Sequence, residues 1–300
     1  MQATTQWRLR TRTLQLGLRT LVMGVVNITP DSFSDGGCFA TPDTAVEHGL
    51  RLLREGADIL DLGAESTRPG TQAGGAHPAV RADEEQARLL PVIEGILKAD
   101  PHAILSVDTY KAETARAALA AGAEIVNDVS GFTWDAQLAQ VCARSGAGVV
   151  LMHTRGRPEE WRTQPRLAPA ALMRMVREGL AASLEAACAA GVPLDSIVLD
   201  PGYGFGKRLE ENYALLARQA ELLHLGRPLL AGLSRKSFLG HTLAPLFAGQ
   251  PAPPRARDNA SLAALTAAIL NGASIVRVHE VRAAAEAARI ADAIRAAPAD

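Results

Sequence analysis

The sequence predicts an α/β fold, a (β/α)8 TIM barrel that forms a single domain with a short N-terminal β-hairpin. Eight short apolar runs alternate with longer segments rich in Ala, Leu, Glu and Arg. The runs are apolar almost throughout, as strands buried on both faces of a parallel sheet must be. No break in composition divides the 300 residues, and a barrel of this class commonly fills about 250 residues or more as one domain.

The elements follow in order along a single domain of residues 1–300. Residues 1–19 are expected to form the hairpin, and the barrel is expected to span about residues 20–298. The expected strands begin at Leu21, Ala57, Ala103, Ala123, Gly148, Ser196, Pro228 and Ser274. Helical segments lie between them, and several end in Gly where a helix needs a left-handed residue. These glycines are Gly56, Gly122, Gly191 and Gly272.

Composition and charge narrow the classes of function. The chain is 48% hydrophobic and carries a net charge of −1, so it has enough apolar residues for a large core and no basic excess for nucleic acid. Its three cysteines form no CxxC pair, which disfavours a disulfide framework or a zinc cluster. No secretory segment and no run of about 18 apolar residues is present. We therefore expect a cytoplasmic protein with small-molecule partners, without nucleic acid or membrane.

Polar side chains cluster where the apolar strands end. The residues are Asn27, Asp61, Asp108, Asn127 and Asp200, then Ser234, Arg235 and Lys236, then Arg277 and His279. In a barrel these strand ends share one mouth, where the active sites of such enzymes lie. A single Asp or Asn there is explained equally well as a helix cap or turn residue. The whole set, with Lys, Arg and His included, favours an active site.

The last two strands carry the cations. Arg277 and His279 are two positions apart and so emerge on one face, and Arg235 and Lys236 end the preceding strand. Barrels often bind a phosphate group at these two loops, because Arg grips oxygens bidentately and Lys adds a point charge. The alternative is that these residues form structural ion pairs with Asp and Glu. The pattern favours a phosphate-bearing ligand.

Three Gly-containing segments are also distinctive. Residues 200–207, DPGYGFGK, miss the P-loop spacing because Pro201 stands where Gly is required, so a tight turn that exposes Tyr203 or Phe205 is expected. Residues 27–37 and 65–75 form unusually long connections with Gly, Pro and Ser or Thr. Such loops are often lids over a site, the alternative being plain connectors.

In order along the chain, these segments resemble the dihydropteroate synthase family over about residues 20–282. The matching runs are NITPDSFSDGG from Asn27, ESTRPG from Glu65, SVDT from Ser106, IVNDVSG from Ile125, LMH from Leu151, LDPGYGFGK from Leu199, GLSRKS from Gly232 and VRVHEV from Val276. The resemblance implies condensation of 6-hydroxymethyl-7,8-dihydropterin diphosphate with p-aminobenzoate. The products would be 7,8-dihydropteroate and diphosphate, in folate biosynthesis.

The resemblance also implies roles for individual residues. The pterin would contact Asp108, Asn127, Met152, Asp200 and Lys236. The diphosphate would contact Asn27, Thr67, Arg277 and His279, with Mg2+ bound at Asn27. The p-aminobenzoate would contact Phe33, Thr67, Arg68, Pro69, Phe205, Lys236 and Ser237. The implied catalytic residues are Asp108, Lys236, Arg277 and His279. The family also implies a homodimer and a sulfonamide target.

The chain departs from the family pattern at two places, and two other functions fit parts of it. Tyr110 stands where Ser is frequent, and Ala64 stands where Gly is common. One alternative is a pterin-dependent methyltransferase barrel, which the intact SRKS and STRPG segments and the lack of a corrinoid-binding domain disfavour. The other is a non-catalytic pterin-binding barrel, which would be expected to have lost Arg68, Lys236, Arg277 or His279, and all four are present.

Overall fold

The computed structural model describes residues 5–28, 41–65, 73 and 80–298. The strands are β1 Thr5–Arg8, β2 Thr13–Leu16, β3 Leu21–Asn27, β4 Ile59–Gly63, β5 Leu105–Asp108, β6 Ile125–Asp128, β7 Gly148–Met152, β8 Ile197–Asp200, β9 Leu229–Ala231 and β10 Ala273–Val278. The helices are α1 Pro42–Glu55, α2 Ala82–Ala99, α3 Ala112–Ala120, α4 Leu138–Ser145, α5 Pro169–Ala189, α6 Leu209–Ala217, α7 Ser237–Thr242, α8 Asp258–Leu270 and α9 Val281–Ala296.

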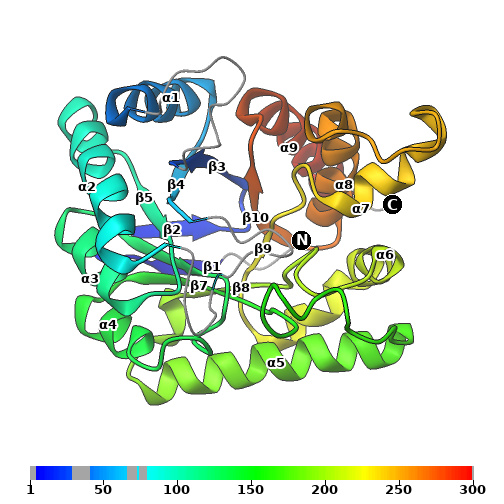
Figure 1. The fold of residues 1–300 in the computed structure, drawn as a ribbon, viewed down its shortest axis with the longest axis horizontal. Coiled ribbons are helices and arrows are strands. Elements are labelled where there is room, and N and C mark those ends of the chain that lie inside the picture. Colours follow the sequence, from blue (N-terminus) through cyan, green and yellow to red (C-terminus); the bar gives the residue numbers. More distant parts are fainter. Residues whose placement is uncertain (1–4, 29–40, 66–72, 74–79, 299–300) are drawn as a thin grey trace.

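Strands β3 to β10 form one closed parallel barrel in the order β10-β3-β4-β5-β6-β7-β8-β9. The helices surround it, so the strands lie inside the molecule (Figure 1). All eight expected strands are present, although most are shorter than the apolar runs that predicted them. The predicted fold class is confirmed. Among the described helices, none combines the length and apolar character that crossing a membrane would require.

Side chains of the strands alternate between two environments because successive residues point to opposite faces. One face packs against the helices in a large core that includes Leu60 and Leu62. The other face fills the barrel interior with a separate cluster to which Ile59, Ile125 and Val198 belong. This alternation determines which residues of each strand reach the mouth.

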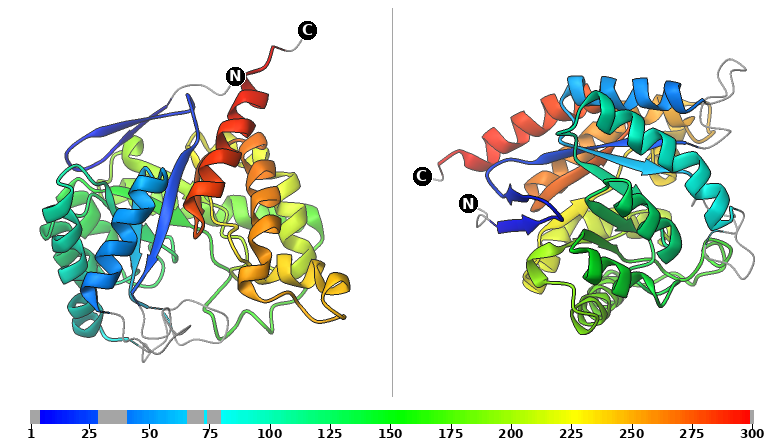
Figure 2. Two further views of the ribbon diagram at one scale, coloured as in Figure 1. Left: turned by 90° about the horizontal axis from the view of Figure 1, so that it is seen from above. Right: turned by 90° about the vertical axis from the view of Figure 1, so that its left-hand side faces the viewer.

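The N-terminal hairpin closes the opposite end of the barrel. β1 and β2 pair antiparallel, as predicted, and Trp7 and Leu16 are fully buried in the interior cluster. The Trp7 indole Nε1 donates to the Ser196 carbonyl at 2.9 Å. Two further views show the hairpin lying across the end of the barrel (Figure 2). The interior is therefore sealed at one end by apolar side chains.

The predicted glycine helix ends are confirmed. Gly56, Gly122, Gly191 and Gly272 all have φ between 92° and 115°, the left-handed conformation that glycine adopts without a steric penalty. One βα unit is more elaborate than the repeat predicts. Between β9 and β10 lie both the short helix α7 and the longer helix α8. This unit carries residues 234–237 of the site described next.

Candidate active site

The inward faces of the strands bring most of the predicted site residues to one mouth. In β4, β6, β7, β8 and β10, the site residue follows an interior-cluster residue by two positions and so shares its face. The side chains on this face near the mouth are Asn27, Asp61, Asp108, Asn127, Met152, Asp200, Arg277 and His279. Residues separated by most of the chain thus meet at one end of the barrel, and we call this set the floor of the mouth.

Arg277 lies at the centre of this floor and binds two carboxylates. Its Nε donates to Asp61 Oδ2 and its Nη2 donates to Asp108 Oδ2, each at 2.6 Å. Asn127 Nδ2 donates to the same Asp61 oxygen at 2.9 Å. The structural ion pairs that the sequence left open are therefore present. They leave the remaining guanidinium nitrogen, Nη1, without a hydrogen bond to the described residues.

The two carboxylates share one guanidinium, so a negative charge remains in excess. Desolvation raises the pKa of Asp108 to about 7, the Arg277 charge opposes that rise, and the Asp61 charge adds to it. The two carboxylates raise the pKa of Arg277, which therefore stays protonated. Asp108 is the titratable member of this triad near neutral pH. Its side chain keeps 18% exposure, so a ligand in the mouth can reach it.

Asp200, Lys236 and Phe205 form a second group at the mouth, which we call its wall. Asp200 Oδ1 accepts the Gly202 N–H at 2.7 Å, while Oδ2 accepts no hydrogen bond from the described part of the chain. Lys236 Nζ lies 3.9 Å from the centroid of the Phe205 ring. Desolvation lowers the pKa of Lys236 to about 7, although the Asp200 charge opposes this shift. This wall offers an open carboxylate oxygen, an amine and an aromatic face.

The Gly-rich run forms the predicted tight turn, and it presents Phe205. Gly202, Gly204 and Gly206 have φ between 69° and 81°. Tyr203 points into the core, where its hydroxyl donates to Gln219 at 2.8 Å. The buried Lys207 Nζ donates to the carbonyls of His153 and Gly202, both at 2.8 Å. Lys207 therefore joins the turn to the backbone that follows β7, and the turn carries Asp200 and Phe205.

Substitution of Gly202 by Ala is expected to disrupt this turn. A Cβ at Gly202 would lie 1.9 Å from the His153 carbonyl oxygen, in addition to about 1–2 kcal/mol of left-handed strain. Gly226 has nearly the same φ, 71°, but a Cβ there meets nothing within 4 Å. Gly202→Ala should therefore lower the free energy of unfolding by about 1–3 kcal/mol more than Gly226→Ala. Equal losses in chemical denaturation would contradict the clash.

The segment after β9 corrects one expectation. Ser234 Oγ lies 2.9 Å from His279 Nδ1, so the last two strands are joined at the mouth. Arg235, expected among the phosphate-binding cations, instead turns toward α8 and pairs with Asp258 and Glu280. The charge of Arg235 is neutralised there because two carboxylates contact it. Ser237 lies exposed at the start of α7, next to Lys236.

An apolar cluster borders the mouth near β7. Met152 packs with Tyr110, Val129 and Ala73, and Phe205 packs against the same cluster. Tyr110, the departure from the family pattern, stacks edge-on against Trp134 with ring centroids 5.2 Å apart. The departure therefore adds aromatic packing beside the site and removes no polar site residue.

Some predicted residues cannot be placed, and one residue was missed. Phe33, Thr67, Arg68 and Pro69 lie outside the described residues, as do most of both long loops. Asp61 was noticed only as a strand-end residue, yet it binds both Arg277 and Asn127. Its other oxygen, Oδ1, is buried without a partner in the described structure. The period-two alternation of β4 was the signal that could have identified it.

Asn27 ends β3 on the mouth side, and its side chain makes no hydrogen bond to the described residues. Its amide oxygen suits a hard cation such as Mg2+. Within the described ranges, no three His, Cys, Asp or Glu residues gather as a metal site.

Comparison with known proteins agrees with this geometry. A family model described as "Pterin binding enzyme" matches residues 23–279. Dihydropteroate synthases of Mycobacterium leprae and Synechocystis are 44% and 42% identical to the chain, and each alignment covers at least 91% of both proteins. The Xanthomonas albilineans dihydropteroate synthase with 4-aminobenzoic acid superposes with a TM-score of 0.85 at 40% identity, covering 99% of this chain and 100% of that one.

A second solved structure, the Yersinia pestis dihydropteroate synthase in complex with a sulfonamide drug, has a TM-score of 0.86 at 39% identity and covers 98% of this chain and all of that one. The barrel and its polar mouth, with the matching family model, define a pterin-binding enzyme. Within that class, identity above 40% along nearly the whole chain is decisive. The chain belongs to the dihydropteroate synthase family.

Proposed function

We propose that the enzyme joins 6-hydroxymethyl-7,8-dihydropterin diphosphate to p-aminobenzoate and releases diphosphate, as the last step that builds 7,8-dihydropteroate. The new C–N bond replaces a C–O bond, and the arylamine loses a proton. The observation that carries the proposal is the single mouth that combines an open carboxylate of Asp200 with Arg277 and Lys236. A solved relative, from X. albilineans, was determined in complex with 7,8-dihydropteroate.

The pterin ring is proposed to bind across β6, β7 and β8. Its amide and 2-amino group form a donor-rich edge that suits Asp200 Oδ2, which is open on the mouth side. Asn127 supplies an amide, and Met152 supplies an apolar face. Each hydrogen bond to a charged group contributes about 1.5–3 kcal/mol. Two or three such bonds would select a pterin over another bicyclic ring.

The diphosphate is proposed to bind at β10 and β3, beside Arg277, His279 and Asn27. Arg277 Nη1 is available for it while Nε and Nη2 hold Asp61 and Asp108. Such preorganised charge stabilises the negative charge that develops on a leaving group. Asn27 would hold Mg2+ together with the diphosphate oxygens, and the bound ion would add positive charge at the leaving group. Thr67 is the further residue proposed to contact the diphosphate.

We propose a dissociative displacement in which the C–O bond breaks before the C–N bond is complete. Positive charge then builds on the dihydropterin, and the ionised Asp108 lies on the same floor to stabilise it. No general base is required because an arylamine is neutral and nucleophilic at pH 7. Lys236 and Phe205, with Ser237 and the predicted Phe33, Thr67, Arg68 and Pro69, would bind p-aminobenzoate.

A diphosphate-release assay tests the reaction. Release should require p-aminobenzoate and should yield dihydropteroate in equal amount. Release that is independent of p-aminobenzoate, or methyl transfer from an assembled folate, would overturn the proposal. Tight pterin binding without any turnover would favour the non-catalytic alternative.

The pH dependence of kcat/KM should be bell-shaped with a maximum near pH 7. Asp108, with a pKa of about 7, becomes ionised as the pH rises, so activity should rise on the acid side. Lys236, also with a pKa of about 7, loses its charge as the pH rises further, so activity should fall on the alkaline side. Lys236→Arg keeps a positive charge and should remove the alkaline fall. A fall that persists in that variant would contradict the assignment.

We further propose a homodimer located in the cytoplasm and a site open to sulfonamides. Exposed apolar side chains support the dimer. Ile290 and Ile294 on α9 and Leu270 at the end of α8 are 64%, 55% and 45% exposed, and α8 and α9 lie side by side (Figure 1). Isolated exposed residues are ordinary, but apolar residues on neighbouring helices suit a partner surface.

A further inference from the structure

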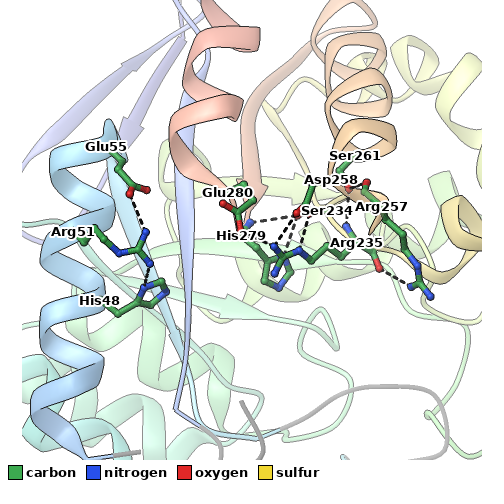
Figure 3. Close-up of polar contacts among 10 residues, drawn as sticks. All are labelled: His48, Arg51, Glu55, Ser234, Arg235, Arg257, Asp258, Ser261, His279 and Glu280. Atoms are coloured by element: carbon green, nitrogen blue, oxygen red, sulfur yellow. Dashed lines mark hydrogen bonds and ion pairs between the residues drawn. The ribbon is translucent and has the colours of Figure 1, made fainter. Parts of the chain in front are cut away.

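The segment Ser234, Arg235 and Lys236 between β9 and α7 sends its side chains in two directions. Ser234 Oγ contacts the His279 ring, and Lys236 Nζ lies over the Phe205 ring. Arg235, between them, points away from the mouth toward α8 (Figure 3). The two flanking residues therefore belong to the site, while the middle residue contacts the framework behind it.

Five hydrogen bonds connect Arg235 to that framework. Its Nε and Nη2 donate to the two oxygens of Asp258 at 2.7 and 3.1 Å, and Nη2 also donates to Glu280 at 2.5 Å. Its backbone N–H donates to Ser261 Oγ, and its carbonyl accepts from Arg257, both at 2.9 Å (Figure 3). The residue is thus tied to the start of α8 and to the end of β10.

The backbone of Arg235 is strained. Its φ is +58°, a left-handed conformation that non-glycine residues seldom adopt. Such a conformation persists only where the surroundings over-determine it, and it is frequent at functional sites. Here the surroundings are the contacts to Ser261, Arg257, Asp258 and Glu280. These contacts hold the turn. The turn points the Arg235 side chain away from the mouth, while the side chains of Ser234 and Lys236 point toward it.

We propose that Arg235 is a positioning residue for the reaction. Its clamp on Asp258 and Glu280 holds the strained turn, and the turn places Lys236 over Phe205 and Ser234 against His279. The inference rests on the proposed function, because turnover is its readout. It also replaces the expectation that Arg235 binds phosphate, since both of its carboxylate partners lie on the framework side.

An ordinary surface ion pair would predict something different. Exposed pairs contribute little, and the chain contains a suitable example in Arg218 and Glu221. That pair is also bidentate, with Nε and Nη2 bound to the two Glu221 oxygens at 2.6 and 3.0 Å, and it lies in the segment between α6 and β9. The Arg235 side chain is only 21% exposed, against 37% for Arg218. Arg218 and Glu221 therefore provide matched controls.

The test compares Asp258→Asn and Arg235→Lys with Glu221→Gln and Arg218→Lys. The first two remove the bidentate contact and should lower kcat/KM for p-aminobenzoate by roughly 10- to 100-fold, because displaced site residues cost rate steeply. The KM for the pterin substrate should change less than kcat/KM for p-aminobenzoate, because Asp200 and Asn127 lie on other strands while Lys236 and His279 supply only part of the contacts proposed for that substrate. The two control variants should match the wild type in both constants.

Arg235→Gly distinguishes the effect of the Arg235 ion pairs from the effect of its backbone strain. Glycine relieves the left-handed strain at φ +58° but removes the guanidinium. The proposal expects low kcat/KM for p-aminobenzoate in this variant although the backbone is favoured. Wild-type kinetics in Arg235→Gly and Asp258→Asn would overturn the clamp while leaving the proposed function intact. Absence of turnover in the wild type and in the control variants would instead overturn the proposed function.

Discussion

Arg277→Met is expected to reduce kcat/KM by about 100- to 1,000-fold and to destabilise the protein at the same time. The loss of rate follows from the proposed role of Arg277, which supplies preorganised positive charge to the leaving group. The loss of stability follows because Asp61, which is fully buried, keeps a carboxylate with no cation beside it. Breaking a buried ion pair by removing one partner costs about 3–5 kcal/mol. Steady-state kinetics and chemical denaturation at pH 7.5 measure the two effects separately.

The double variant Asp61→Asn/Arg277→Met separates those two roles. It removes the buried charge together with its cation, so part of the lost unfolding free energy should return. Turnover should remain as low as in Arg277→Met, because the guanidinium that we propose binds the diphosphate is still absent. Recovery of turnover with stability would mean that Arg277 acts only as a structural counterion.

Trp7→Ala should have the largest effect on stability alone. Trp7 is fully buried in the barrel interior, and its indole donates to the Ser196 carbonyl. Its removal should lower the free energy of unfolding by about 3–5 kcal/mol. At a temperature where the variant remains folded, its kcat should match the wild type because the hairpin lies at the end opposite the mouth. Thermal and chemical unfolding, with kinetics at low temperature, provide the measurement.

Leu18→Ala provides the control for the hairpin. Leu18 follows β2 closely but is 73% exposed, so its truncation removes little buried surface. Its unfolding free energy should stay within about 0.5 kcal/mol of the wild type. A loss as large as that of Trp7→Ala would show that the hairpin region acts through the unfolded state rather than through packing in the barrel.

The sequence predicted the barrel well because the barrel depends on local patterns. The first barrel strand was expected to begin at Leu21, and β3 begins at that residue. Each buried strand needs an apolar run, and glycines such as Gly56 and Gly272 end helices by their own conformational freedom. The same period-two logic predicted that Arg277 and His279 share a face. These features could be predicted because each depends only on residues close together in the sequence.

The partners of the charged residues did not follow from the sequence. Arg277 and Asp61 are 216 positions apart, so their ion pair exists only once the barrel is closed. The direction of Arg235 depends on a left-handed turn and on Asp258, which lies 23 positions further on. An arginine at a strand end has several acids within reach, and only the packed structure selects among them. The roles of Phe33, Thr67, Arg68 and Pro69 stay predictions.

The sealed end of the barrel has a consequence for handling the enzyme. The described chain begins in the hairpin that closes this end, and α9 runs back from the mouth to finish on the same side (Figure 2). A surface anchor or fusion partner attached on this side of the barrel would therefore leave the mouth facing solution. The enzyme could therefore be immobilised, or fused to a second protein, without blocking the path of substrates to the mouth.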